Sequence, residues 1–263
     1  MPRTGPPAFN VPPVVLALLG GVIVIHAARS LLPAELDFQL LVGLAFIPAR
    51  FGGPHGDLGL PGGLAGDLWT WFSYAALHAD AVHVTVNSIW FLAFGSAVAR
   101  RFGTARFLAL SAAAAAAGAA AHLVSHWGEP TPMIGASAVV SAYMAAAIRF
   151  VFDPRIGIGG LGSGDARAVH APVLPLSRAL RNRTVLAFVI VWFGINFLFG
   201  LGAVAVPGAS GTIAWQAHIG GFLVGLFGFR LFDPAERATS GGGPPPAYPR
   251  VIDARGEEED DGL

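Results

Sequence analysis

The 263-residue sequence contains no cysteine and no lysine, and it has few charged residues of any kind. The absence of cysteine excludes disulfide bonds and thiolate chemistry, whether catalytic or metal-binding. All sixteen basic residues are arginine, and they form neither a nucleic-acid-binding patch nor a polybasic lipid-binding segment. Only 12% of the residues are charged, about half the share in an ordinary soluble domain. The composition therefore excludes a soluble globular protein, and we expect no nucleic-acid partner.

Hydrophobic residues make up 54% of the sequence and gather in long runs that carry almost no charge. Six of these runs reach or approach the length that crosses a hydrocarbon core of roughly 30 Å. They are Val11–Ala28, Ala81–Val98, Phe107–Val124, Met133–Phe152, Val185–Val206 and Ile213–Phe232. We therefore predict an all-α membrane protein, a six-transmembrane-helix bundle whose partner is the lipid bilayer.

A seventh apolar run, Leu36–Ile47, is too short to span a bilayer and is followed by Pro48 and a stretch rich in glycine and proline. An interfacial or re-entrant element in the first outer connection fits this pattern best. The same connection ends in four aromatic residues that suit a belt at headgroup level, namely Trp69, Trp71, Phe72 and Tyr74.

The arginines are unevenly distributed among the predicted connections, and their distribution predicts the orientation. Only Arg29 and Arg50 lie in the three connections on one side, whereas the other fourteen lie on the opposite side. By the positive-inside rule both termini are cytoplasmic, and a compact six-span protein suits a bacterial inner membrane. Residues 1–10 are then a short cytoplasmic N-terminus, 11–232 the membrane domain, and 233–263 a disordered acidic cytoplasmic tail.

The predicted spans contain no Asp or Glu at depth, so most proton relays and carboxylate metal sites lack their ligands. The sequence also shows no internal repeat of the transporter type, which disfavours a transporter or channel. A metal site at His122 and His126, four residues apart on one helix, is an alternative without an identifiable third ligand. We expect neither a metal nor another cofactor.

Polar side chains are costly in hydrocarbon unless paired, so those inside the predicted spans are candidate functional residues. His83 and Asn87 are four residues apart and share one helical face, although interhelical hydrogen bonding is an equal alternative for them. Ser137 follows Gly135, and a glycine there lets backbone N–H groups near a helix start face a ligand. Taken alone, Ser137 is more simply interpreted as a structural serine bonded back to the Met133 carbonyl.

His218 is followed by Gly221 and Gly225 on the same helical face, where small residues let another helix approach closely. The run that contains Ser137 has a matching stripe of small residues, Ala138, Ser141, Ala142 and Ala145. If these two faces pack together, Ser137 and His218 come within reach of each other. Gly135, Gly221 and Gly225 are therefore predicted to support the packing around the site.

The predicted spans also place the polar candidates at one depth. At a rise of 1.5 Å per residue, Asn87, Ser137 and His218 all lie roughly 8–10 Å below the outer ends of their helices. A serine becomes a good nucleophile when a neighbouring histidine takes its proton. Since no buried carboxylate is available to orient the histidine, the expected unit is a Ser–His dyad.

These residues resemble those of the rhomboid intramembrane serine proteases. The resemblance lies in H-x-x-x-N at His83–Asn87, G-x-S at Gly135–Ser137 and A-H-x-x-G-x-x-x-G at Ala217–Gly225. All three motifs occur in the family's order, among six predicted spans and after a long first outer connection. The resemblance implies the rhomboid type of helix bundle over most of the chain.

Carried over residue by residue, the resemblance makes Ser137 the nucleophile and His218 the general base, with His83, Asn87 and the Ser137 backbone N–H as the oxyanion site. It implies a cofactor-free endopeptidase that cleaves single-span or multi-span membrane proteins near the outer membrane face. The alternative is a catalytically inactive rhomboid-like protein that binds membrane clients, and the retention of Ser137 and His218 argues against it. The sequence does not indicate an oligomeric state.

The chain departs from the family pattern at two positions after the serine. Ala138 stands where the family commonly has glycine, and Ser141 stands where an aromatic or a small residue is frequent. The sequence therefore predicts no ring from position 141 to stack on His218.

Overall fold

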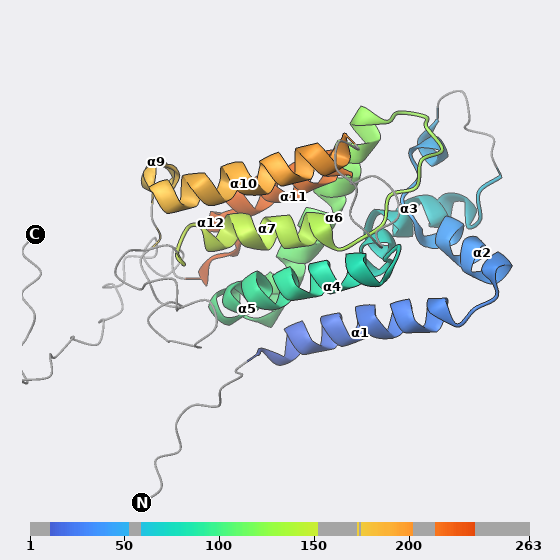
Figure 1. The fold of residues 1–263 in the computed structure, drawn as a ribbon, viewed down its shortest axis with the longest axis horizontal. Coiled ribbons are helices and arrows are strands. Elements are labelled where there is room, and N and C mark those ends of the chain that lie inside the picture. Colours follow the sequence, from blue (N-terminus) through green and yellow to red (C-terminus); the bar gives the residue numbers. More distant parts are fainter. Residues whose placement is uncertain (1–10, 53–58, 152–172, 174, 202–213, 235–263) are drawn as a thin grey trace, which may run out of the picture.

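The computed structural model describes residues 11–52, 59–151, 173, 175–201 and 214–234 of the chain. Every regular element within these residues is helical, and the one backbone bridge outside the helices joins Phe46 to Met133 (Figure 1). The predicted N-terminal segment 1–10 and nearly all of the predicted tail lie outside the described residues. The prediction of an all-helical protein with several long apolar helices is confirmed.

The long apolar helices coincide with predicted spans. Three segments are long and apolar enough to cross a membrane, namely α1 (Pro13–Ser30), the continuous segment Ala81–Phe102 and α6 (Thr104–Ser125). The second of these consists of α4 (Ala81–Trp90), the π-helical turn η3 (Phe91–Gly95) and α5 (Ser96–Phe102). Shorter helices follow, namely α7 (Ser137–Ala147), α9 (Leu176–Arg181), α10 (Arg183–Gly200), α11 (Trp215–Phe227) and α12 (Phe229–Phe232). The count of six spans stays a prediction.

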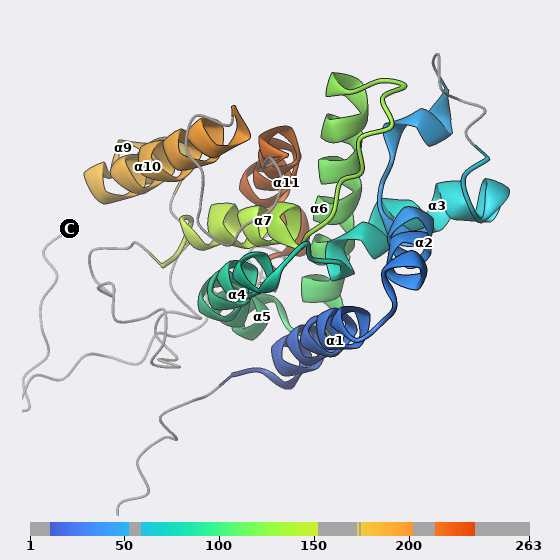
Figure 2. The ribbon, with the colours of Figure 1, turned by 45° about the vertical axis from the view of Figure 1, so that its right-hand side comes forward.

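Helix α7 lies inside the bundle, and α4, α6 and α11 pack against it (Figure 2). Its sequence alternates small and branched apolar residues, and every residue from Ala138 to Ala147 is buried. A helix that is apolar all round is suited to such a central position. The residues in the first turn of α7 are therefore held in place by neighbouring helices on several sides.

The short run Leu36–Ile47 forms α2 (Ala34–Leu44), which is too short to span a bilayer, followed by η1 (Pro48–Phe51), α3 (Gly63–Ser73) and η2 (Tyr74–Ala76). Side chains cap the end of α2, where backbone carbonyls lack helical partners. The bonds run from Arg50 Nη2 to Val42 O (2.9 Å), from Trp69 Nε1 to Gly43 O (2.9 Å) and from Ser73 Oγ to Leu44 O (2.6 Å). The first outer connection is thus a structured unit.

The aromatic residues of this connection do not form a single belt. Trp69 and Phe72 are exposed, as a belt at headgroup level requires, but Tyr74 is buried. Its hydroxyl donates to the carbonyl of Ala115 in α6 at 2.8 Å. The prediction was wrong for Tyr74 because a buried tyrosine needs a partner for its hydroxyl, and α6 supplies one.

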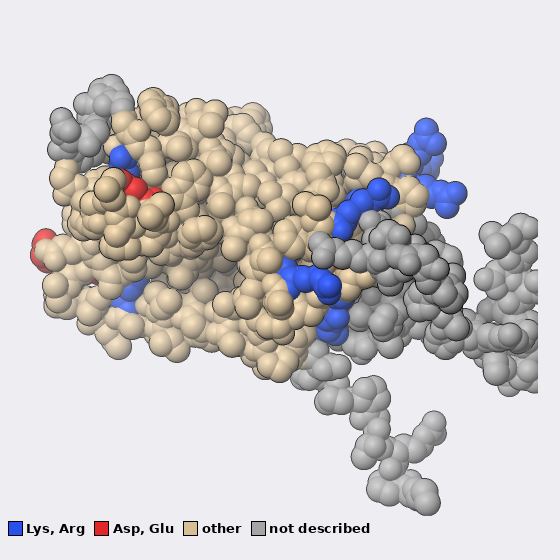
Figure 3. Space-filling view, turned by 180° about the vertical axis from the view of Figure 1, so that it is seen from behind, with Lys and Arg blue, Asp and Glu red and all other residues tan. Residues whose placement is uncertain are grey.

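The charged side chains divide between the two ends of the bundle (Figure 3). Arginines gather at the end formed by α5, α9 and α12, whereas Arg29 and Arg50 lie at the other end. Arg29 is buried and pairs with Asp37 through a 2.7 Å contact. The structure thus keeps the asymmetry that the sequence shows.

An ion pair joins α5 to the chain after α12 at the arginine-rich end. Arg101 Nη2 lies 2.9 Å from Asp233 Oδ2, and both side chains are almost completely buried. The Arg101 guanidinium also lies over the rings of Phe150 and Phe229, at 4.8 and 5.6 Å from their centroids. Asp233, which the sequence groups with the tail, is therefore packed as part of the bundle.

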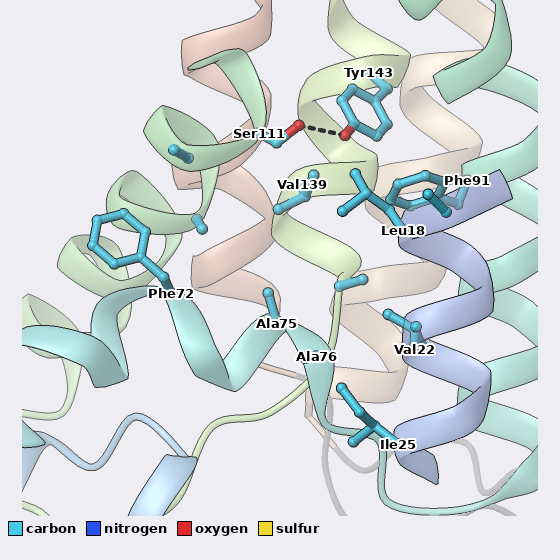
Figure 4. Close-up of a pocket in the computed structure, with 15 residues that line it drawn as sticks. Leu18, Val22, Ile25, Phe72, Ala75, Ala76, Phe91, Ser111, Val139 and Tyr143 are labelled. Atoms are coloured by element: carbon cyan, nitrogen blue, oxygen red, sulfur yellow. Dashed lines mark hydrogen bonds between the residues drawn. The ribbon is translucent and has the colours of Figure 1, made fainter. Parts of the chain in front are cut away.

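An apolar cavity of about 370 Å³ lies between α1, α3, η2, α6 and α7 (Figure 4). Leu18, Val22 and Ile25 of α1 line one side of it. The only polar side chains in its lining, Ser111 and Tyr143, bond to each other at 2.6 Å. The cavity lies on the face of α7 that carries Val139 and Tyr143, about half a turn away from Ser137.

Candidate active site

Ser137 is the first residue of α7. The sequence predicted helix from Met133, but Met133 exchanges both backbone hydrogen bonds with Phe46, at 2.8 and 3.1 Å. Gly135 then has a φ of 117° and donates its N–H to the Tyr74 carbonyl at 3.0 Å. The helix therefore begins four residues later than the apolar run predicts. Ser137 lies in the first turn, where backbone N–H groups have no helical acceptor.

The Ser137 hydroxyl makes no hydrogen bond to any other described residue. The structural interpretation of Ser137 requires a bond back to the carbonyl of Met133, and that carbonyl accepts the N–H of Phe46. The hydroxyl is half-buried at the helix start. This leaves Ser137 available for chemistry.

Gly135 brings the imidazole of His83 against the backbone beside Ser137. A Cβ on Gly135 would lie 2.7 Å from His83 Nε2 and 3.8 Å from Ser137 Oγ. Any other residue would both displace the imidazole and strain the backbone at this positive φ. Gly135 thus supports the site by making room for His83, rather than by helix packing as the sequence predicted.

The tautomer of His83 follows from its neighbours. Asp80 caps α4 by accepting the backbone N–H of His83 at 2.8 Å. His83 Nδ1 accepts a weak hydrogen bond from the Ala79 N–H at 3.4 Å, which assigns the ring proton to Nε2. The protonated Nε2 is therefore the His83 nitrogen that lies against Gly135.

His78 supports this arrangement and was not predicted to do so. It is buried, its ring lies edge-on to that of His83 at 4.9 Å, and its Nε2 accepts the Ala136 N–H at 3.5 Å. Burial, together with the nearby His83 and His26, lowers the pKa of His78 to about 3. His78 is therefore neutral. Only a neutral imidazole has a ring nitrogen that can accept the Ala136 N–H.

Asn87 is buried one turn below His83 on α4. Its amide nitrogen donates one N–H to the His83 carbonyl at 3.0 Å. A primary amide carries a second N–H, which remains for another acceptor. The bond within α4 fixes the side chain without using up its capacity to donate.

Helices α7 and α11 approach each other at their small residues. A Cβ on Gly221 would collide with the carbonyl of Ala138, and one on Gly225 would collide with the carbonyl of Ala142. His218 lies three residues before Gly221 on α11, and Ser137 lies one residue before Ala138 on α7.

No hydrogen bond joins Ser137 to His218 in the described structure. Catalytic hydrogen bonds are often long or misaligned before substrate binds and tighten in the complex. His218 is buried, and its Nδ1 bonds to Asn196 Oδ1 of α10 at 2.5 Å. Trp192, also on α10, lies nearly parallel to the His218 ring at 6.3 Å.

The sequence analysis missed both α10 residues. An asparagine inside the apolar run Val185–Val206, four residues after a tryptophan, was the available signal. Position 141 supplies no ring, as the sequence predicted. The Ser141 hydroxyl donates to the Ser137 carbonyl at 2.8 Å. The ring that reaches His218 comes from a different helix.

Comparison with protein families identifies the chain. The Rhomboid domain matches residues 65–233, which include His83, Asn87, Ser137, Asn196 and His218. The chain belongs to the rhomboid family. This rhomboid is therefore an integral membrane protein, and the family predicted from its three motifs is confirmed.

Three bacterial relatives of this rhomboid are named rhomboid protease GlpG. The protein of Pectobacterium atrosepticum is 29% identical over 163 residues, which cover 60% of this chain and 46% of the relative. That of Yersinia pseudotuberculosis is 26% identical over 163 residues, with the same coverage. That of Serratia proteamaculans is 25% identical over 171 residues, 65% of this chain and 50% of the relative. The chain spans about half the length of the curated relatives that it matches.

The alternative metal site at His122 and His126 gains no third ligand. The two rings stack at 4.3 Å, and both nitrogens of His122 are buried without a partner. Within the part of the rhomboid that the structure describes, no three His, Cys, Asp or Glu side chains are grouped to hold a metal.

Proposed function

We propose that this rhomboid is an intramembrane serine endopeptidase in which Ser137 is the nucleophile and His218 the general base. The observation that supports the proposal is the close packing of α7 on α11, in which Gly221 meets Ala138, the residue after Ser137, and His218 lies one turn before Gly221. Serine at its ordinary pKa is a weak nucleophile, and an adjacent imidazole is the usual means of activating it.

In the reaction, His218 Nε2 takes the Ser137 proton as Oγ attacks the carbonyl carbon of the scissile bond. The same imidazole then gives that proton to the leaving amine as the peptide bond breaks. The acyl-enzyme ester is hydrolysed by water, with His218 again acting as base. No metal or cofactor enters any of these steps.

Three donors are available for the oxyanion that forms on the attacked carbonyl. They are the Ser137 N–H at the start of α7, His83 Nε2–H beside Gly135, and the second N–H of Asn87. Fixed donors in a water-poor site stabilise developing charge strongly, and removing one typically costs about 10²–10³ in kcat. The three donors come from two helices that pack against each other.

We also propose the membrane setting that the sequence predicts, with six spans and both termini in the cytoplasm of a bacterium. Most described arginines lie at the end opposite the start of α7, and by the positive-inside rule this supports an outer location for Ser137. The substrates would then be single-span or multi-span membrane proteins, cut near that face. Scissile bonds would lie where a substrate helix readily unwinds, because a helical backbone is hard to attack.

The test uses the full purified chain with a panel of single-span substrates and a serine-directed fluorophosphonate. Ser137→Ala and His218→Ala should each abolish cleavage, and the double variant should be no worse, since residues that act as a unit are not additive. Ser111→Ala, which removes a serine of α6 far from the site, is the matched control and should remain active. Cleavage by Ser137→Ala would refute the proposal, and an inert wild-type protein would favour a client-binding rhomboid without activity.

A further inference from the structure

Two side chains of α10 contact the imidazole of His218. Asn196 Oδ1 bonds to His218 Nδ1, and the Trp192 ring lies nearly parallel to the imidazole, with an interplanar angle of 23°. Trp192 and Asn196 are four residues apart, so they share one face of α10. His218 and Asn196 are both at least 95% buried.

The second bond of the Asn196 amide determines which way the amide points. Its nitrogen donates to the Trp192 carbonyl at 2.7 Å, so the atom that faces His218 is the oxygen. An amide oxygen only accepts hydrogen bonds, and His218 Nδ1 must therefore carry the ring proton. Nε2 is then left with the lone pair that a general base needs.

Trp192 is itself held in place. Its ring lies edge-on to that of Trp90 at 5.6 Å, so it is held between α4 and the imidazole of α11. Aromatic rings in this geometry restrict each other's orientation as well as burying surface. The hydrogen bond fixes which nitrogen of His218 is protonated, and the tryptophan limits the rotation of the ring.

We propose that Asn196 is a positioning residue for His218, with Trp192 as its support, and that α10 thereby completes the catalytic unit. The inference rests on the proposed function. When His218 takes the Ser137 proton on Nε2, its Nδ1–H stays bonded to Asn196 Oδ1. No proton passes to Asn196, because an amide oxygen is not a base at neutral pH. The unit is then Ser137–His218–Asn196, with the third member acting only on orientation and tautomer.

The first experiment compares Asn196→Leu with Asn196→Asp, measuring kcat, KM and melting temperature on the same preparations. Leucine fills the space without an acceptor, so kcat should fall by about 10²-fold, as expected for a misplaced catalytic group, with KM nearly unchanged. Aspartate restores an acceptor for Nδ1–H and should recover most of kcat. It also buries a carboxylate, which is costly, and should melt below the leucine variant.

The predicted order of activity is therefore the reverse of the predicted order of stability. A merely structural role for Asn196 would make activity follow stability, with the aspartate variant the worse of the two. Ser111→Ala, which removes an interhelical hydrogen bond to Tyr143 far from His218, is the control and should lower stability without changing kcat. If Asn196→Asp is no more active than Asn196→Leu, the inference is wrong.

A second pair of variants applies if the Asn196 variants do not fold. Trp192→Phe keeps a ring beside His218 and should retain most of kcat, whereas Trp192→Leu should lose at least tenfold at unchanged KM. Equal kcat in the two variants would overturn the role of the ring. Ser137→Ala separates the two proposals. If it is active, the proposed function fails, and if it is inert while Asn196→Leu and Trp192→Leu cleave normally, only this inference fails.

Discussion

Replacing Gly221 by alanine should damage this rhomboid more than replacing a helical glycine that has open space beside it, such as Gly194. Gly221 lies where α11 touches α7, and a Cβ there would collide with the carbonyl of Ala138. The obstruction is backbone, which cannot rotate away as a side chain can. We therefore expect α11 to shift away from α7 and to carry His218 with it.

The magnitude follows from two opposing contributions. Overpacking a well-packed interface typically costs about 1–3 kcal/mol. Alanine in place of glycine within a helix returns up to about 1 kcal/mol. Gly194 of α10 is the matched control, because no atom lies within 4 Å of a Cβ built there. Gly194→Ala shares the helix-propensity gain, so the difference between the two variants isolates the packing cost.

The assay is reversible unfolding in mixed micelles, with cleavage measured on the folded fraction. Gly221→Ala should be less stable than Gly194→Ala by about 1–3 kcal/mol. It should also lose activity, since a displacement of about 1 Å near the chemistry can cost about 10²-fold in rate. Equal stability of the two variants would show that α7 and α11 do not pack as closely as the glycines indicate.

Three further predictions test other parts of the molecule. Asn87→Ala should lower kcat through the loss of about 2.7–4 kcal/mol of transition-state stabilisation. It should lower the free energy of unfolding by only about 0.6 kcal/mol. Early melting with a normal kcat would assign Asn87 to helix packing. A reporter active only in the cytoplasm, fused to Leu263, should give signal, and a signal only from a periplasmic reporter would reverse the orientation. Gly21 lines the 370 Å³ cavity and Gly20 does not, so Gly21→Leu should have a higher melting temperature than Gly20→Leu. Equal melting temperatures would mean that the cavity is already filled.

Spacing in the sequence was sufficient to predict the helical class, the family and the small-residue faces of α7 and α11. A glycine face three and seven residues after His218 can be read from helical periodicity alone, because both positions lie on one side of a helix. The family match then confirmed the rhomboid family that the motifs at His83, Ser137 and His218 indicated.

Features that depend on contacts distant in sequence were not predictable in this way. The start of α7 is delayed because Met133 pairs with Phe46, a segment nearly ninety residues earlier that carries no pairing signal. Tyr74 is buried in the bundle, where its hydroxyl donates to a carbonyl of α6. Asn196 escaped notice because its importance comes from lying opposite His218, and no local pattern gives the position of α10 around α11.

The ion pair between Arg101 and Asp233 has a consequence for the order of biosynthesis. Arg101 is made when less than half of the chain has been synthesised, and Asp233 follows 132 residues later. Until then the end of α5 cannot reach its native buried state, because Asp233 is the counter-charge that the final packing provides. Release of the last helix into the membrane is therefore the step that completes the bundle. A nascent chain that stalls before residue 233 should remain a substrate for membrane quality control, even though Ser137, Asn196 and His218 have already been synthesised.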